Sequence, residues 1–144
     1  MAGLLIGQDA VSAELRLWAQ TAFAWGQRDC LLSIVHYVAR VTGRTVPDWP
    51  RYSSGAGAAR ILRRHGGLEP YAAMVMAGMG CRRTIWPVRG DVGLINVPGS
   101  GLGACLSLGR QWAMRGPDGV VITSVIGRVT AWAVDPGRSP CPLR

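Results

Sequence analysis

The chain has 144 residues, of which 49% are hydrophobic, and carries a formal net charge of +8. This length is enough for one domain with its own core, and the composition excludes a largely disordered chain. All 16 basic residues are arginines, and they are scattered along the sequence. Because nucleic-acid-binding proteins usually concentrate their positive charge among aromatic residues, we do not expect nucleic acid as a partner. We interpret the charge as a general attraction for acidic proteins or an anionic cell envelope.

The apolar runs are too short to cross a bilayer, so we expect no transmembrane segment. The first residues lack the basic region of a signal peptide and soon reach Asp9 and Glu14. We therefore expect the protein to be made in the cytoplasm without a signal peptide.

The cysteines are widely spaced and form no C-x-x-C pair, the spacing that zinc sites normally show. We expect no metal and no other cofactor. Our interpretation is that all except Cys30 are reduced, mostly buried thiols. The four are Cys30, Cys81, Cys105 and Cys141.

Helical patterns fill the first half of the chain. Apolar residues recur at spacings of three and four after Asp9, and the pattern continues toward Trp25. A second helix is predicted from an N-cap at Asp29 to about Thr42, where Gly43 closes it. Two shorter helices are predicted at about 56–65 and 69–79.

After Pro87 the pattern changes to short alternating runs separated by turn sequences, which indicates antiparallel strands joined by hairpins. Helices first and strands second predict an α+β domain, with the helices packed on a small antiparallel sheet or half-barrel. We expect a single domain over residues 1–144, with an irregular tail at about 135–144. The predicted strands are "DVGLINV", "GLGACLSLG", "RQWAMRG", "GVVITSV" and "VTAWAV".

Cys30 is the candidate nucleophile, because it would occupy the first turn of the second helix. There the helix dipole and the free backbone N–H groups stabilise a thiolate and can receive an oxyanion. Asp29 opposes this, since a nearby carboxylate disfavours the thiolate. From chemistry alone, a catalytic Cys30 and a buried structural Cys30 both remain open.

A turn ending in Asp-Cys before a buried helix, followed later by "RGDVGLINV", resembles the NlpC-type cell-wall peptidases. These are papain-like cysteine peptidases that cut the stem peptides of peptidoglycan. Within that superfamily, "FAWGQRDC", "VTGRTVPDWPRYSSGAGAARILRRHGGL" and "TAWAV" are similar to a phage-tail branch, encoded among tail-tip genes of siphophages and of phage-like gene transfer agents. The likeness runs from about Phe23 to Val134.

The resemblance implies a papain-like NlpC fold and assigns roles to particular residues. Cys30 matches the family's nucleophile, and Asp29 matches the acidic residue before it. Gly90 and Asp91 match the Gly-Asp that starts the sheet and shapes the cleft.

The family's general base does not match. It is a His at the start of the next strand, where this chain has Gly103 or Ala104. Gln111 is the nearest candidate for the polar residue that would orient such a base. Without the imidazole, the nucleophile lacks the group that deprotonates it and later protonates the leaving amine.

The two histidines of the chain, His36 and His65, are the candidates to replace the missing base. His36 lies six residues after Cys30 on the same helix, roughly 120° away around its axis, so it cannot reach the thiol. His65 remains only a weak candidate base, because an exposed place at a helix C-terminus explains it better.

We therefore expect a tail-tip or baseplate component of a phage or phage-like particle, with a degenerate cysteine peptidase fold. Its partners would be the tail hub and the fibre-bearing tail-tip proteins, and it would be located in the virion. The alternative is an active peptidoglycan endopeptidase that uses Cys30 to aid cell-wall penetration during DNA delivery.

Two further classes remain as alternatives: a metal or iron–sulfur module, which needs the four cysteines to converge, and an arginine-driven nucleic-acid binder. We rank both below the first two.

Overall fold

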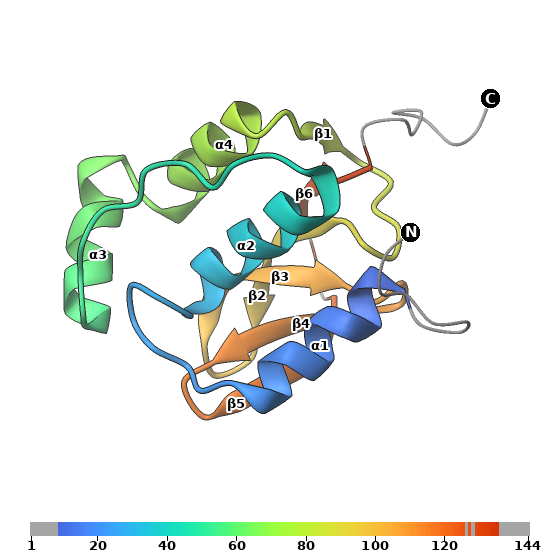
Figure 1. Cartoon of the computed structure of the whole chain (residues 1–144), viewed down its shortest axis with the longest axis horizontal. Helices are drawn as coiled ribbons and strands as arrows, with labels where there is room; N and C mark the ends of the chain where they lie inside the picture. The colour runs from blue at the N-terminus through green and yellow to red at the C-terminus, as the bar shows by residue number, and fades with distance from the viewer. Residues whose placement is uncertain (1–8, 126, 128, 136–144) are drawn as a thin grey trace.

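The computed structural model describes residues 9–125, 127 and 129–135. Four helices come first and six strands follow (Figure 1). The helices are α1 (Ala10–Gln20), α2 (Cys30–Thr42), α3 (Gly55–Arg64) and α4 (Leu68–Gly78). The strands are β1 (Arg82–Thr84), β2 (Val92–Val97), β3 (Gly101–Ser107), β4 (Gln111–Gly116), β5 (Gly119–Ser124) and β6 (Thr130–Ala133). The predicted α+β class is confirmed.

The two long N-terminal helices begin where their capping residues predict. Asp9 accepts a hydrogen bond from the Ser12 N–H at 2.9 Å and caps α1. Asp29 does the same for α2, and Gly43 ends that helix with a φ of 75°.

The first helix is shorter than its apolar pattern predicts. It ends at Gln20, because the C-cap residue Thr21 is extended, and the carbonyl groups that follow bond to arginine side chains. Arg115 donates to the Thr21 carbonyl, and Arg28 Nε donates to the Ala22 carbonyl at 2.6 Å. Residues 21–29 therefore form a turn that leads into α2.

All strands pair antiparallel in one sheet, in the order β1-β6-β2-β3-β4-β5. The five predicted strands are present, and β2 to β5 are joined as consecutive hairpins. The expectation of hairpins throughout was wrong at the end, because β6 returns between β1 and β2. The short strand β1 was not predicted, since its sequence "RRT" has no apolar alternation.

The sheet buries apolar side chains on both faces. The helices cover one face, with α2 crossing β3 and β4 and α1 packing near β5 (Figure 1). The larger core lies there, centred on α2 and including Val35 and Leu106. A smaller cluster includes Ile95, Trp112 and Met114, and Cys30 packs against it. The first residue of α2 therefore stands beside the second cluster.

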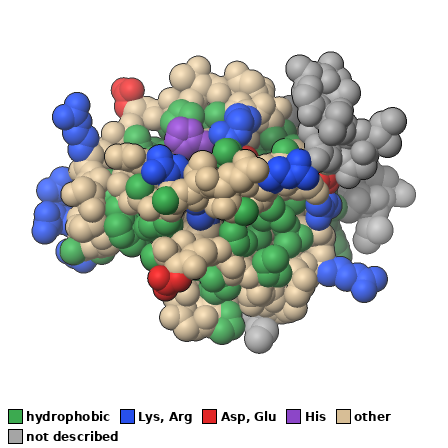
Figure 2. Space-filling model, turned by 60° about the horizontal axis from the view of Figure 1, so that its bottom comes forward, with side chains coloured by type: hydrophobic (Ala, Val, Ile, Leu, Met, Phe, Trp, Pro, Cys, Tyr) green, Lys and Arg blue, Asp and Glu red, His purple; other side chains and the backbone are tan. Residues whose placement is uncertain are grey.

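The surface agrees with the scattered pattern of arginines in the sequence. Figure 2 shows their side chains at several places on one face, with hydrophobic side chains between them. Within the described residues, no helix is long and apolar enough to span a membrane. The tail predicted at about 135–144 falls outside the described residues from position 136 onward.

Candidate functional site around Cys30

Cys30 is the first residue of α2, where the sequence places it. Asp29 caps the helix by accepting from the Leu32 N–H at 2.9 Å. The turn before it is tight, because Gly26 has a φ of 77° and its N–H donates to the other Asp29 carboxylate oxygen at 2.9 Å. The turn and the cap therefore place Cys30 at the first position of α2.

The carboxylate of Asp29 is fully engaged. It is buried, and the oxygen that receives the Gly26 N–H also accepts from the Tyr52 hydroxyl at 2.6 Å. That hydroxyl accepts from Trp49 Nε1 at 3.0 Å. Burial first, and then the bond to Asp29, raise the pKa of Tyr52, so its hydroxyl stays protonated as a donor. This network ties the loop between α2 and α3 to the start of α2.

A cavity of about 400 Å³ lies over Cys30. Its walls come from the turn before α2, the loop before α3, the helices α3 and α4, the start of β3 and the end of β4. Most lining side chains are apolar, and five are aromatic: Phe23, Trp25, Trp49, Tyr52 and Tyr71. The polar or charged side chains on its wall, besides the two tyrosines, belong to Asp29, Cys30, Ser100 and Arg115.

On the β3 side of the cavity, Met114 lies where a side chain at position 103 would be. Cys30 and Gly103 line the same cavity, and the backbone of Ala104 acts to lower the pKa of the thiol, so Cys30 lies beside the part of β3 where the family resemblance expects a histidine. A Cβ atom at Gly103 would lie 2.5 Å from Met114 Sδ. The Met114 side chain therefore occupies the space that a side chain at position 103 would need.

The environment of Cys30 raises the pKa of its thiol. Burial is the largest cause, and the charge of Asp29 is the second. The backbone N–H groups of Ala104, Leu31 and Cys30 act in the opposite direction but do not prevail. The sequence left a catalytic and a buried structural Cys30 both open, and in this environment desolvation outweighs the helix dipole.

Neither histidine lines this cavity. His65 is the C-cap residue of α3 and is exposed. Its Nδ1 lies 3.0 Å from the Ile61 carbonyl oxygen, and its ring centroid lies 4.6 Å from that of Tyr71, with the two rings tilted by 52°. His36 lies on α2 and lines a different, smaller pocket. The structure therefore does not place His65 as a base for Cys30.

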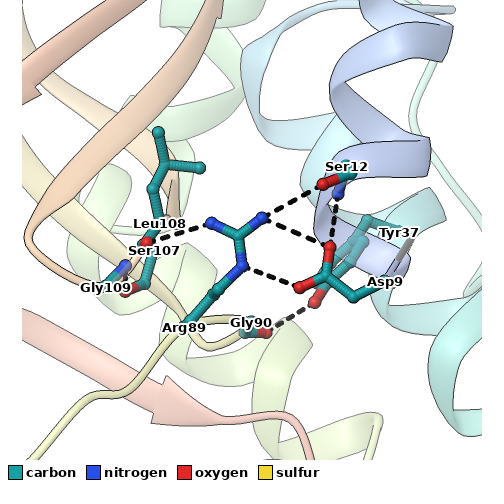
Figure 3. A network of polar contacts seen from close by, with 8 residues as sticks. All are labelled: Asp9, Ser12, Tyr37, Arg89, Gly90, Ser107, Leu108 and Gly109. Carbon is teal, nitrogen blue, oxygen red and sulfur yellow. Dashed lines mark hydrogen bonds and ion pairs between the residues drawn. The ribbon is translucent and has the colours of Figure 1, made fainter. Parts of the chain in front are cut away.

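Gly90 and Asp91 do not line the cavity either. The resemblance assigns them a role in shaping the cleft, but in this structure they make other contacts. The Gly90 carbonyl accepts from the Tyr37 hydroxyl at 2.7 Å (Figure 3). The buried Asp91 carboxylate accepts from the backbone N–H groups of Val88 and Val134. Both residues fasten loops to the sheet.

Beside Gly90, Arg89 joins three parts of the fold (Figure 3). It pairs with Asp9, the N-cap of α1, at 2.7 Å and donates to the Leu108 carbonyl at 3.0 Å. Gln111 is exposed at the start of β4, opposite Ser124, and it also stays off the cavity wall. Of the predicted site residues, only Asp29 and Cys30 line the cavity.

The metal hypothesis needs the cysteines to converge. Cys30, Cys81 and Cys105 are free thiols, and no group of three or more potential metal-ligating side chains comes together in the described part of the chain. Cys141 lies outside that part. The described residues therefore give no support to a metal or iron–sulfur site.

A family model for a domain of unknown function (DUF6950) matches residues 7–134. The chain belongs to this family. No curated protein and no solved structure matches the chain. The DUF6950 match includes every described helix and strand, so the family model covers the whole described fold.

Sequence reasoning missed several residues of this DUF6950 cavity. Trp49 and Tyr52 lie in the loop before α3, and nothing in their spacing indicates that Tyr52 bonds to Asp29 and Trp49 to Tyr52. Met114 and Arg115 lie next to each other in a strand and point to opposite faces of the sheet. A cavity formed by several segments that are far apart in sequence has no signature in any one of them.

Proposed function

We propose that this protein is a non-catalytic, NlpC-like module of a phage or phage-like tail tip. In this proposal the cavity over Cys30 is a recognition pocket derived from a peptidase cleft. One observation carries the proposal: Cys30 shares its cavity with Gly103 and Met114, and Met114 lies beside Gly103, one of the two positions where the resemblance expects a histidine.

The chemistry of the wall supports the loss of catalysis. A cysteine peptidase needs a group that accepts the thiol proton and later donates it to the leaving amine. Asp29 is committed to three hydrogen-bond donors, and Arg115 and the tyrosines are protonated groups. The raised pKa of Cys30 keeps the thiol protonated near neutral pH. No residue on the wall provides the missing proton acceptor.

The shape of the cavity favours binding instead. Its volume of about 400 Å³ lies in the range of pockets that hold small ligands or anchoring side chains. Its aromatic wall suits an apolar or aromatic segment of a neighbouring protein. In a tail tip, the hub and the fibre-bearing proteins would supply such segments, and the positive surface would attract acidic partners.

The active endopeptidase is the second candidate, because of one observation. The backbone groups of Ala104 and Leu31 act to lower the pKa of the Cys30 thiol, which is the effect that stabilises a thiolate nucleophile. A base supplied by a neighbouring subunit would complete that site, and peptidoglycan would be its substrate.

Peptidoglycan digestion tests both candidates. Purified protein and intact particles are incubated with peptidoglycan, and the released muropeptides are identified by mass spectrometry. The matched variant is Cys30→Ala, because it removes only the sulfur. The proposal expects no difference between wild type and variant in either preparation. Release that depends on Cys30 would establish the endopeptidase instead.

The location needs a separate test. The proposal expects this chain among the proteins of purified particles, and chemical cross-linking should join it to hub or fibre-bearing proteins. Its absence from particles would contradict the tail-tip assignment and leave the digestion result unaffected.

A further inference from the structure

A second, smaller cavity of about 180 Å³ lies between the end of α1, the turn before α2 and one side of α2. Arg115 lines both this cavity and the one over Cys30. Its side chain is 4% exposed, although arginine is rarely buried without an acidic partner. The contacts of Arg115 therefore need an explanation.

Every hydrogen-bond partner of Arg115 is neutral. One terminal nitrogen donates to the Thr21 carbonyl and hydroxyl, at 2.6 Å and 2.5 Å, and the other donates to the Ser33 hydroxyl at 3.4 Å. Among the described residues, no carboxylate lies within ion-pairing distance of Arg115. The bond to Thr21 caps the end of α1, but neutral partners leave a buried positive charge uncompensated.

The other charges around this cavity make the imbalance larger. Arg28 and Arg40 also line it, against a single carboxylate, Glu14. Glu14 is already committed, because it pairs with Arg40 and accepts from Trp18 Nε1 at 2.8 Å. Two positive charges, those of Arg28 and Arg115, remain without a counter-charge inside the cavity.

The electrostatics of the neighbouring groups agree with this imbalance. Burial, and then the charge of Arg28, lower the pKa of Arg115. Burial, and then the charge of Arg40, lower the pKa of His36, which keeps that ring neutral at pH 7. Two arginines that repel each other across a small cavity are stabilised by an anion placed between them.

We propose that this cavity binds a compact, doubly charged oxyanion of the phosphate or sulfate class between Arg28 and Arg115. Guanidinium groups recognise such oxyanions with paired, charge-assisted hydrogen bonds. The Ser33 hydroxyl, which accepts from Arg115, keeps its proton as a further donor. The volume equals roughly six water molecules, which is enough for a tetrahedral anion and too small for a drug-sized ligand.

This inference goes beyond the proposed function and does not depend on it. The cavity is partly open to solvent, so the anion can be a free ion or a phosphate group carried by a larger molecule. The shared chemistry is the tetrahedral dianion, and the experiment separates its two sources.

Isothermal titration calorimetry with the full chain tests the site. Inorganic phosphate, sulfate and glycerol phosphate are each titrated at constant ionic strength, which is held with sodium chloride. We expect saturable one-to-one binding of the dianions that chloride does not reproduce. Glycerol phosphate binding as well as phosphate would indicate a carried group, and phosphate binding alone would indicate a free ion.

Variants assign the binding to this cavity. Arg28→Gln should weaken phosphate binding about tenfold, because one charged donor pair is lost. Arg110→Gln is the matched control: it removes the same charge from an exposed residue that lines neither cavity, and it should leave affinity unchanged. Arg115 itself is not altered, because its bonds to Thr21 and Ser33 hold the fold together.

A second variant changes affinity in the opposite direction. Glu14→Gln keeps an acceptor for Trp18 and removes the only carboxylate of the cavity, so it should tighten phosphate binding roughly threefold. Thermal unfolding of each variant checks that it is folded, and phosphate should raise the Tm of the variants that bind it. No saturable binding above chloride, or equal affinities of Arg28→Gln and Arg110→Gln, would overturn the proposal.

Discussion

The two cavities on either side of Arg115 differ in how their polar groups are satisfied. Over Cys30, the carboxylate of Asp29 has all its partners, and the rest of the wall is mainly apolar. Across Arg115, two arginine charges have no ion-pair partner among the described residues. The first cavity therefore suits recognition by shape, and the second suits recognition by charge. The position of Cys30 at a helix N-terminus indicates the first cavity but gives no sign of the second.

The largest effect is expected from Asp29→Ala, because it removes the group that organises the first cavity. The change deletes the N-cap of α2 and leaves the donors of Gly26 and Tyr52 without their acceptor. We expect a loss of about 3 kcal/mol or more in the free energy of unfolding, measured by urea denaturation.

The control for that change is Ser54→Ala, which deletes the exposed N-cap of α3. Its expected cost is about 1 kcal/mol, because water replaces the lost bond. Equal losses for the two variants would show that the network between Asp29 and Tyr52 adds nothing beyond a cap.

The next effect concerns the turn that holds this network. In Gly26→Ala, the new Cβ would lie 2.1 Å from the Tyr52 carbonyl oxygen, and alanine would have to adopt a positive φ. We expect a loss of about 3 kcal/mol. Gly43→Ala is the matched control, since Gly43 has a φ of 75° with open space around it, and only about 1 kcal/mol should be lost. Similar losses would contradict the close approach of the turn to Tyr52.

A smaller effect tests the filled base position. Gly103→Ala brings a Cβ atom against Met114 Sδ, and we expect a loss of about 1 kcal/mol because the flexible methionine can partly give way. In the Met114→Ala background, the same change at Gly103 should cost less than it does alone. A double-mutant cycle from urea denaturation measures this coupling, and additive losses would mean that Met114 does not occupy the space.

Local sequence predicted much of the fold for physical reasons. Asp29 and Gly43 bound α2 because capping and positive φ depend on single residues. The strand β1 was missed because its stability comes from pairing with β6, which is distant in sequence. The return of β6 between β1 and β2 is likewise a long-range choice that no local pattern encodes.

The candidate site was likewise predictable from the sequence only where it depends on residues that are adjacent in the chain. Cys30 and Asp29 were found because a cap and the first helical residue are adjacent in sequence. The net sign of the Cys30 pKa shift was not predictable, since it depends on how deeply the thiol is buried beside Ala104. Arg115 was not singled out, because its burial follows from the packing of α1, α2 and β4 together. Tertiary packing, rather than the motif, decides whether the thiol is activated.

The most direct test of the central claim is the pH dependence of Cys30 alkylation by iodoacetamide, followed by site-resolved mass spectrometry. Because the thiol pKa is raised, the thiolate forms only at high pH. The account predicts a slow rate at pH 7 that is still rising above about pH 8.5, the ordinary pKa of a free cysteine. A plateau of fast alkylation reached below pH 7 would show a thiolate paired with a base, and would contradict a non-catalytic Cys30.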